Sequence, residues 1–336
     1  MSAAGRDPTA RAERDATPQV PAIDAVDLVK HYPVRSGWLR PPRRVRALDG
    51  VGFVLPPART LAVVGESGCG KTTLARLLAT IERPTSGTLR IVGEPPGSDR
   101  ASAHRLRRRV QMVFQNPYGS LNPRKTVAAI LDEPLAIDGV LDRAARRARV
   151  AELLARVGLS QEQAGRHPHM FSGGQRQRIA IARAMALEPA VIVADEPVSA
   201  LDVSIQAQIL NLFMDLQERY RTAYVFVSHD LAVVEHLAHD VMVMYLGRAV
   251  EIAPARTLFA GPAHPYAKAL LATRLRLGPQ AARPVVPIRG EPPSPLDPPG
   301  GCAFHPRCPE ALERCRAERP TLRPLGDGRL VACHLV

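Results

Sequence analysis

The chain has 336 residues, of which 46% are hydrophobic and 4% aromatic, and its formal net charge is +13 at pH 7. This length can bury a substantial core and favours one main domain with an appendage, whereas no apolar run approaches the ~20 residues that cross a bilayer, which argues against an integral membrane protein. The positive charge suits nucleic acid or an anionic membrane surface, but no nucleic-acid-binding motif with interleaved aromatic residues is visible, so we expect no nucleic-acid partner.

Residues 1–21 predict a disordered leader. Between Met1 and Val20 the sequence is polar, mixed in charge and without the apolar stretch of a secretory signal. Further along, residues 105–109 read Arg-Leu-Arg-Arg-Arg. A basic cluster of this kind is typical of a solvated face.

A phosphate-binding loop is the most specific motif of the chain. Leu61–Val64 predicts a buried strand, and Thr73–Leu78 predicts the start of a helix. The loop between them fills every fixed position of the pattern G-x-x-x-x-G-K-[ST] with Gly65, Glu66, Ser67, Gly68, Cys69, Gly70, Lys71 and Thr72. In this context backbone N–H groups and the helix dipole hold a phosphate. Lys71 is expected to reach the β- and γ-phosphates, and Thr72 to ligate Mg²⁺.

The region from about 117 to 174 predicts a helical unit. Its clearest helix runs from Ala144 to Val157, where apolar residues recur at helical spacing. Ser172 then resembles the cap of another helix, and the following Gly173 and Gly174 would expose N–H groups at its start. This helix start is a second candidate site for an anion.

A short apolar run at 190–194 predicts a central parallel strand that is buried on both faces. It ends in Asp195 and Glu196. Asp195 is placed to hold Mg²⁺ directly or through water, and Glu196 to orient a water molecule as general base. Alone, such a pair is more often a solvated acidic turn, but together with the phosphate loop it indicates nucleotide hydrolysis.

The part of the chain beyond about Pro254 is rich in proline and poor in strand signals. Four of the five cysteines lie there, namely Cys302, Cys308, Cys315 and Cys333, while Cys69 of the phosphate loop is expected to be inert. Disulfides are disfavoured in a reducing compartment, so metal ligation is the favoured interpretation. The spacing is wider than in C-x-x-C zinc sites, and Cys308-Pro309 is similar to pairs near iron–sulfur clusters. Iron–sulfur, zinc and free thiols all remain open.

The segment Ser172–Gln175, upstream of the Asp195–Glu196 strand end, resembles the signature motif of the ATP-binding cassette (ABC) ATPases. The other motifs of that family follow in the same order. The resemblance implies a nucleotide-binding set of Tyr32, Gly65, Glu66, Ser67, Gly68, Cys69, Gly70, Lys71, Thr72, Thr73, Gln115, Ser172, Gly173, Gly174, Gln175 and Asp202. It further implies Thr72, Gln115 and Asp195 as Mg²⁺ ligands and Lys71, Glu196 and His229 as catalytic groups.

The chain departs from the family pattern in two small ways. Phe171 replaces the usual leucine, and Ala58 stands where a turn glycine is common. Neither change removes a catalytic group.

The resemblance implies an α/β fold of the P-loop NTPase cassette type, with a parallel sheet core, an antiparallel β subdomain and the helical insert. This nucleotide-binding domain would span 22–253, and a Pro- and Cys-rich extension would span 254–336. His264-Pro265-Tyr266 and the short helix after it resemble the C-terminal extension of dipeptide and oligopeptide importers. That likeness also implies a [4Fe–4S] cluster on the four cysteines.

The function implied is the ATP-hydrolysing subunit of such an importer, at the cytoplasmic face of the plasma membrane. Since one chain has one phosphate loop and one signature, the partner would be a second cassette, more often a homologue than an identical copy. Two transmembrane permease subunits, and indirectly an extracytoplasmic substrate-binding protein, would complete the assembly. Alternatives are another cargo such as nickel or a sugar, a soluble ABC ATPase of translation or DNA repair, and a non-catalytic partner with a decayed site.

Overall fold

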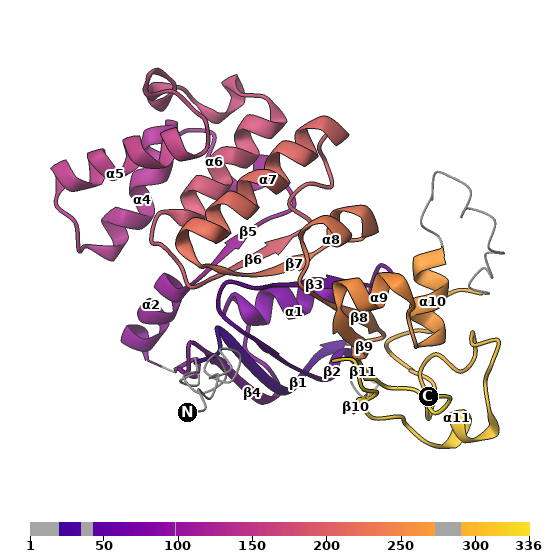
Figure 1. The fold of residues 1–336 in the computed structure, drawn as a ribbon. Coiled ribbons are helices and arrows are strands. Elements are labelled where there is room, and N and C mark those ends of the chain that lie inside the picture. Colours follow the sequence, from indigo (N-terminus) through magenta and orange to yellow (C-terminus); the bar gives the residue numbers. More distant parts are fainter. Residues whose placement is uncertain (1–19, 35–42, 98, 273–289) are drawn as a thin grey trace, which may run out of the picture.

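A computed structural model describes residues 20–34, 43–97, 99–272 and 290–336 (Figure 1). Apart from its last two residues, the predicted leader lies outside the described residues. The strands of the larger sheet are β3 (Thr60–Val64), β5 (Val110–Val113), β6 (Val191–Asp195), β7 (Ala223–Val227), β8 (Asp240–Tyr245), β9 (Arg248–Pro254), β10 (Arg323–Pro324) and β11 (Leu330–Val331).

This central sheet is mixed, not purely parallel, which corrects the expected parallel core. Its order is β10-β11-β9-β8-β3-β7-β6-β5. The strands from β8 to β5 are parallel to their neighbours, and β9, β11 and β10 join antiparallel at one edge. The change of direction comes from a two-residue hairpin between β8 and β9, where Leu246 and Gly247 both have positive φ (43° and 76°). Two such residues make the turn that matches the twist of paired antiparallel strands.

A second, antiparallel sheet has the order β2-β1-β4 and is formed by β1 (Ile23–Val34), β2 (Arg43–Leu55) and β4 (Ser86–Ile91). Helix α1 (Lys71–Leu78) lies between the two sheets (Figure 1). One apolar cluster joins Leu74 and Leu77 of α1 to Ile23 of the small sheet and to Val63 of the central sheet. This burial fixes the start of α1, and therefore the phosphate loop, between the sheets.

The opposite face of the central sheet is covered by the predicted helical unit and by the helices that follow it. The elements here are α3 (Pro117–Ser120), α4 (Val127–Asp138), α5 (Arg143–Arg156), the 3₁₀ turns Gln161–Gly165 and Pro168–Met170, α6 (Gly173–Met185), α7 (Val203–Tyr220) and α8 (Leu231–Leu237). Helix α2 (Arg100–Arg109) instead buries Leu106 in the cluster that contains α1. Helix α5 begins after Asp142, whose side chain accepts a hydrogen bond from the Ala145 N–H. Its apolar stripe, Val150, Leu153 and Leu154, is buried as the helical spacing predicts.

The C-terminal part packs against the β8–β9 edge with α9 (Ala255–Ala260), α10 (Pro265–Ala272), α11 (Glu313–Ala317) and the short strands β10 and β11. Those two strands were not foreseen. Tyr245 of β8 packs against Tyr266 and Phe304, with ring centroids 4.7 and 5.3 Å away. Together with Leu258 these rings form one apolar cluster, so the C-terminal part shares its core with the cassette.

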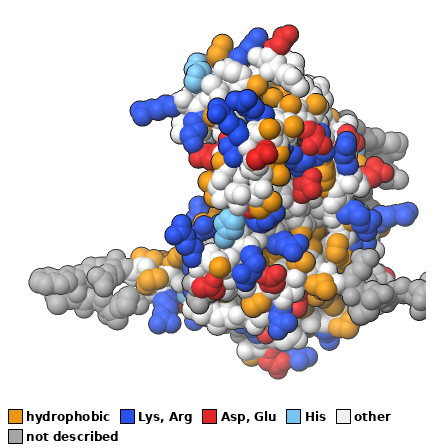
Figure 2. Space-filling model, turned by 90° about the vertical axis from the view of Figure 1, so that its left-hand side faces the viewer, with side chains coloured by type: hydrophobic (Ala, Val, Ile, Leu, Met, Phe, Trp, Pro, Cys, Tyr) orange, Lys and Arg blue, Asp and Glu red, His pale blue; other side chains and the backbone are white. Residues whose placement is uncertain are grey.

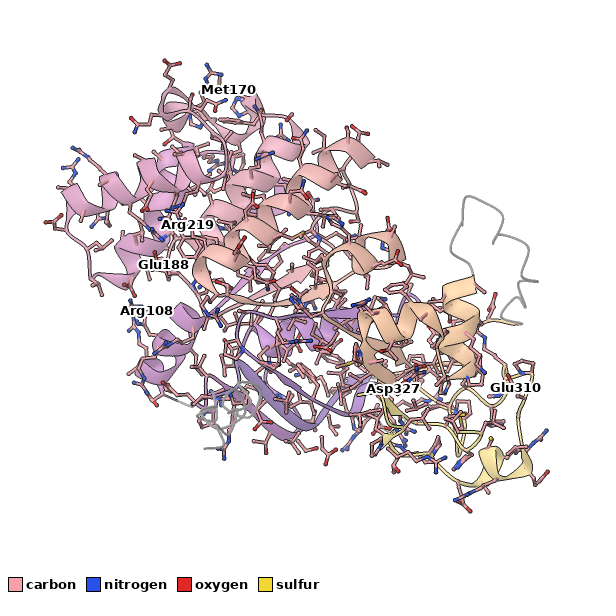
Figure 3. All side chains as sticks on the ribbon, in the orientation of Figure 1. Arg108, Met170, Glu188, Arg219, Glu310 and Asp327 are labelled. Carbon is pink, nitrogen blue, oxygen red and sulfur yellow. The ribbon has the colours of Figure 1, made fainter. Side chains whose placement is uncertain are left out.

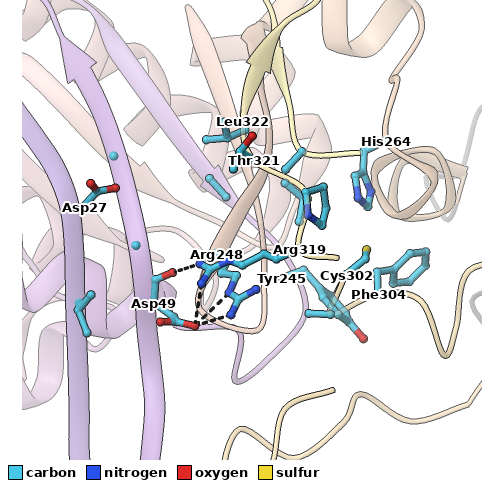
Figure 4. Close-up of a pocket in the computed structure, with 18 residues that line it drawn as sticks. Asp27, Asp49, Tyr245, Arg248, His264, Cys302, Phe304, Arg319, Thr321 and Leu322 are labelled. Carbon is cyan, nitrogen blue, oxygen red and sulfur yellow. Dashed lines mark hydrogen bonds and ion pairs between the residues drawn. The ribbon is translucent and has the colours of Figure 1, made fainter. Parts of the chain in front are cut away.

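A cavity of about 600 Å³ lies between the small sheet and the C-terminal part (Figure 4). At its wall, Asp49 of β2 accepts hydrogen bonds from Arg248 of β9, at 2.5 and 3.1 Å, and its backbone oxygen accepts one from Arg319 at 2.6 Å. Burial alone would raise the pKa of Asp49, but the hydrogen bond and the charges of both arginines lower it. Asp49 thus ties the small sheet to the C-terminal part.

The basic cluster of α2 lies on the surface. Arg105, Arg107, Arg108 and Arg109 are all exposed, and Figure 3 shows Arg108 at the outer side of the molecule. Arg108 pairs with Asp138 at 3.0 Å and Arg105 with Glu94 at 3.7 Å. Figure 2 shows Lys and Arg interspersed with Asp and Glu. The predicted solvated face is confirmed. None of the helices in the described part of the chain combines the length and apolar character needed to cross a membrane.

Candidate functional site

The phosphate loop connects buried β3 to α1, as predicted, and its glycines are sterically required. A Cβ added at Gly65 would lie 2.3 Å from the Met244 backbone oxygen, and one at Gly70 would lie 2.4 Å from the Ala47 backbone oxygen. Both residues have positive φ, at 152° and 106°. Because neither position leaves room for a Cβ, the loop can pass between β2 and β8 only if both residues are glycine.

Lys71 lies within the loop and is 8% exposed. Its Nζ donates to the backbone oxygens of Gly65 at 2.7 Å and Glu66 at 2.9 Å. The ammonium is therefore held by the loop at the point where the motif places phosphate oxygens. Burial raises the pKa of the neighbouring Cys69 thiol, which keeps it protonated and agrees with the expectation that it is inert.

Asp195 ends β6 and is buried. The Thr72 hydroxyl hydrogen-bonds to its carboxylate. Burial raises the pKa of Asp195 and the charge of Glu196 adds to this, while the Thr72 hydrogen bond and Lys71 act in the opposite direction. A hydroxyl and a carboxylate in contact are hard oxygen donors, so they fit Mg²⁺, and a cation there would favour the ionised carboxylate.

Glu196 meets two of the other predicted residues. Its Oε2 accepts a hydrogen bond from Gln115 Nε2 at 2.9 Å, and its Oε1 lies 3.2 Å from His229 Nδ1. These residues follow β5, β6 and β7, which are adjacent parallel strands. The carboxyl ends of such strands are where α/β proteins bind ligands, which explains how residues 115, 196 and 229 come together.

A cavity of about 680 Å³ joins this group to the phosphate loop. The lining is Tyr32, Val45, Ala47, Ser67, Gly68, Gly70, Lys71, Thr72, Thr73, Gln115, Glu196, His229 and Pro295. Tyr32 is held at its mouth because its hydroxyl donates to Glu82 Oε2 at 2.6 Å. Lys30 pairs with the same carboxylate at 3.2 Å. Burial and this hydrogen bond raise the pKa of Tyr32, which keeps the ring neutral and suited to stacking on a base.

The signature segment does not line this cavity. Ser172 caps α6 through a reciprocal pair of hydrogen bonds, with Ser172 Oγ accepting from the Gln175 N–H at 3.3 Å and Gln175 Oε1 accepting from the Ser172 N–H at 3.1 Å. Asp202 begins α7 with no side-chain cap bond and is exposed. The described chain therefore separates Ser172–Gln175 and Asp202 from its own phosphate loop.

Two contacts of the site were missed at the level of sequence. Glu82, which holds Tyr32, belongs to no motif. Glu66 of the phosphate loop pairs with Arg307, whose Nη1 and Nη2 lie 2.7 and 3.0 Å from the two carboxylate oxygens. These partners are 241 positions apart, and no local pattern signals such a pair.

The four C-terminal cysteines are free thiols, two of them buried. Burial raises the pKa of Cys308 to about 11, and the charges of Cys302 and Cys333 add to the shift. The Cys302 N–H donates to the Cys315 backbone oxygen at 2.8 Å, so these two cysteines lie close together. Within the described ranges, however, no group of three or more His, Cys, Asp or Glu side chains is arranged to hold a metal ion. The structure gives the predicted cluster no support, and we derive no step from it.

A phosphate loop that holds its lysine, a buried aspartate beside the loop threonine, and a glutamate beyond it define the P-loop nucleotide-binding proteins. The family model described as "ABC transporter" matches residues 48–199, and the model described as "Oligopeptide/dipeptide transporter, C-terminal region" matches residues 250–315. The match covers the loop, the signature and the Asp195–Glu196 strand end.

Curated relatives match nearly the whole chain. The di/tripeptide transport ATP-binding protein DppF of Pseudomonas aeruginosa is 59% identical over 93% of this chain and 97% of its own length. The dipeptide transport ATP-binding protein DppF of Escherichia coli is 55% identical over 96% and 97%. The chain therefore belongs to the ABC transporter family, among the ATP-binding proteins of dipeptide and oligopeptide transporters.

Solved structures agree with the fold. CbiO1 of Clostridium perfringens, part of an ABC transporter complex, has a TM-score of 0.63 and 26% identity over 72% of this chain and 91% of its own. A dimeric post-hydrolysis state of an ATP-binding cassette bound to ADP and Pi has a TM-score of 0.62 and 28% identity over 70% and 99%. Both cover the cassette.

Proposed function

We propose that this chain hydrolyses ATP to drive the import of dipeptides or oligopeptides through partner transmembrane subunits. The observation that carries the proposal is the position of Glu196 between Gln115 and His229, in one cavity with Lys71. Because both oxygens of this carboxylate are held beside the phosphate loop, Glu196 is positioned to act as a general base.

The motif residues of the site have distinct roles in this proposal. Tyr32 stacks on adenine, and the loop N–H groups with Lys71 hold the phosphates. Thr72 and Asp195, with Gln115, hold Mg²⁺, which when bound neutralises charge on the phosphate oxygens. Glu196 takes the proton of the attacking water. His229 and Lys71 stabilise charge that develops on the γ-phosphate.

The separated signature segment supports a site shared between two cassettes. Ser172–Gln175 and Asp202 would complete the nucleotide site of a second cassette, and a similar solved cassette bound to ADP and Pi is a dimer. We propose a homologous cassette as partner, two permease subunits above it, and a peripheral position at the cytoplasmic face of the plasma membrane. The domains proposed are 22–253 for the cassette, with its helical unit at about 117–174, and 254–336 for the extension.

The test is a pull-down with the Glu196→Gln variant, tagged and solubilised gently from membranes in the presence of ATP. Recovery of two multispanning proteins and a second cassette would support the importer. Recovery of ribosomes or DNA-repair proteins without membrane subunits would replace it with a soluble ATPase.

The cargo is a separate question, and an uptake experiment addresses it. The names of the relatives favour peptides, while nickel and sugars are the alternatives. Uptake of a labelled dipeptide by cells that carry the chain and its partners, compared with cells carrying Glu196→Gln, decides between them.

The iron–sulfur assignment of Cys302, Cys308, Cys315 and Cys333 stays a prediction with its own test. Protein purified without oxygen should contain iron and absorb in the visible charge-transfer region. Bound zinc would favour the second alternative, and the absence of both metals would leave four free thiols.

A further inference from the structure

We propose that the C-terminal part is a component of the ATP site, with Arg307 and Tyr266 as positioning residues that hold the phosphate loop through Glu66. The inference deepens the proposed function, since it rests on the loop binding ATP. The two positioning residues, Arg307 and Tyr266, are not among the lining residues of the nucleotide cavity.

Glu66 is held through both its side chain and its backbone. Its carboxylate makes the paired contacts with Arg307 at 2.7 and 3.0 Å, and its backbone N–H donates to the Tyr266 hydroxyl at 2.9 Å. Its backbone oxygen accepts from Lys71 Nζ at 2.9 Å. A shift of Glu66 would therefore move an acceptor of the lysine that binds phosphate.

Arg307 is itself fixed, which is what a positioning residue requires. Its side chain is 6% exposed, and it also donates to the Gly290 backbone oxygen at 3.0 Å and to the Tyr245 hydroxyl at 3.4 Å. The Arg307 N–H closes a turn on the Phe304 oxygen at 3.0 Å. Phe304 is 2% exposed and is packed against Tyr245, so the turn that presents Arg307 is anchored in the shared core.

A second contact links the same part of the chain to the cavity. Pro295 is one of the lining residues of the nucleotide cavity, and its backbone oxygen accepts from the Arg46 N–H at 3.1 Å. Arg46 adjoins Ala47, another lining residue. The C-terminal part thus meets the ATP site at the phosphate loop and at the segment of β2 that lines the cavity.

The charge of Glu66 explains how its pair with Arg307 would affect ATP binding. A carboxylate in a loop that binds phosphate repels the ligand, because like charges at short range oppose each other. The bidentate contact with Arg307 neutralises Glu66 and directs its carboxylate to the C-terminal part. Without Arg307, the Glu66 carboxylate would lose its ion-pair partner within a loop that binds phosphate, and ATP would bind more weakly.

The experiment compares KM for ATP, kcat and ATP affinity in four variants. Arg307→Ala should raise KM and the dissociation constant about tenfold, as expected for loss of one charge-assisted contact. The kcat should change by less than about threefold, because Arg307 touches none of the catalytic groups and its loss weakens mainly the binding of ATP. For Arg307→Lys, the KM and the dissociation constant should fall between those of the wild type and Arg307→Ala, since lysine keeps the charge and loses the paired geometry.

Two further variants separate the charge from the fold. Glu66→Gln combined with Arg307→Ala should recover part of the lost affinity, because it removes the unpaired carboxylate. Arg314→Ala is the matched control, since Arg314 is an exposed arginine of the same region that pairs with Glu318 at 2.7 Å. It should leave KM unchanged. A KM for Arg307→Ala equal to that of Arg314→Ala would overturn the proposal.

Hydrogen exchange of backbone amides 65–71 without nucleotide tests the positioning apart from catalysis. Tyr266→Phe keeps the ring and loses the acceptor for the Glu66 N–H, so exchange in this segment should rise several-fold. Unchanged exchange in both Tyr266→Phe and Arg307→Lys would reject the role even if Arg307→Ala fails to fold. A wild-type protein without ATPase activity would count against the proposed function, while the exchange result would still decide the positioning.

Discussion

Glu196 has a left-handed backbone, with φ at 47°, and its N–H donates to the Val227 oxygen at 2.9 Å. This conformation costs a non-glycine residue about 1–2 kcal/mol. Here it directs the carboxylate away from the end of β6 and toward Gln115 and His229. Strain of this kind is typical of functional sites, and it gives the strand-end glutamate a geometry that differs from a solvated turn.

Glu196→Gln should retain ATP binding and lose about 10²–10⁴-fold of the turnover, since the amide keeps the shape of the side chain and cannot accept a proton. Steady-state hydrolysis and binding of a fluorescent ATP analogue measure the two effects. Glu162→Gln, at an exposed turn, is the control and should behave as wild type. Turnover near the wild-type rate would reject Glu196 as the base.

At the scale of elements, α6 joins the signature to the core. Gly174 is buried against α7, and a Cβ added there would lie 2.5 Å from Ile205 Cγ2. The branched side chain of Ile205 has few alternative rotamers. The second glycine of the signature therefore sets how closely α6 and α7 pack.

Gly174→Ala should destabilise the chain by about 1–3 kcal/mol, because overpacking forces a backbone or rotamer shift. Denaturant unfolding measures the change. Gly173→Ala is the matched control, since its Cβ would lie 3.4 Å from Leu201 Cδ2, an ordinary contact. Equal effects at the two positions would show that loss of glycine, not contact with α7, is responsible.

The local elements of the site could be predicted from sequence, and the long-range ones could not. The strand, loop and helix around Lys71, and the cap at Ser172, depend on neighbouring residues, so their patterns are visible in the chain. The antiparallel β9 depends on a tight Leu246-Gly247 turn without the usual Asn-Gly signal. The position of Arg307 beside the phosphate loop depends on contacts between distant segments, which no sequence periodicity predicts.

At the scale of the whole molecule, the C-terminal part docks through His264 as well as through the aromatic cluster. His264 is 1% exposed, and its Nδ1 accepts from the Tyr266 N–H at 3.0 Å. Its Nε2 is buried and has no hydrogen-bond partner in the described structure. Burial and, to a smaller extent, the charge of Lys268 lower the pKa of His264 to about 4.

Acid should therefore weaken this docking. The unfolded chain, with a histidine pKa near 6.5, binds more protons than the folded chain between pH 6.5 and about pH 4, so stability is present above pH 6.5 and is lost as the pH falls. The loss contributed by His264 should be about 2 kcal/mol between pH 7 and pH 5.

His264→Asn keeps an acceptor without the titration, so its unfolding free energy should depend less on pH in this range. Burial raises the pKa of Glu251, which acts in the opposite direction and is common to both proteins. The difference between variant and wild type at each pH isolates His264. A constant difference from pH 7 to pH 5 would contradict the prediction.

The contact between Glu66 and Arg307 also has a consequence for synthesis of the chain. The ribosome makes residue 66 well before residue 307, which lies 241 positions further along the chain, and folding of a nascent chain begins at its N-terminal side. The phosphate loop can therefore form on the ribosome before Glu66 has Arg307 to pair with. A cassette whose synthesis stops before residue 307 carries a Glu66 carboxylate without this partner, so we expect full affinity for ATP only once that part of the chain has been made.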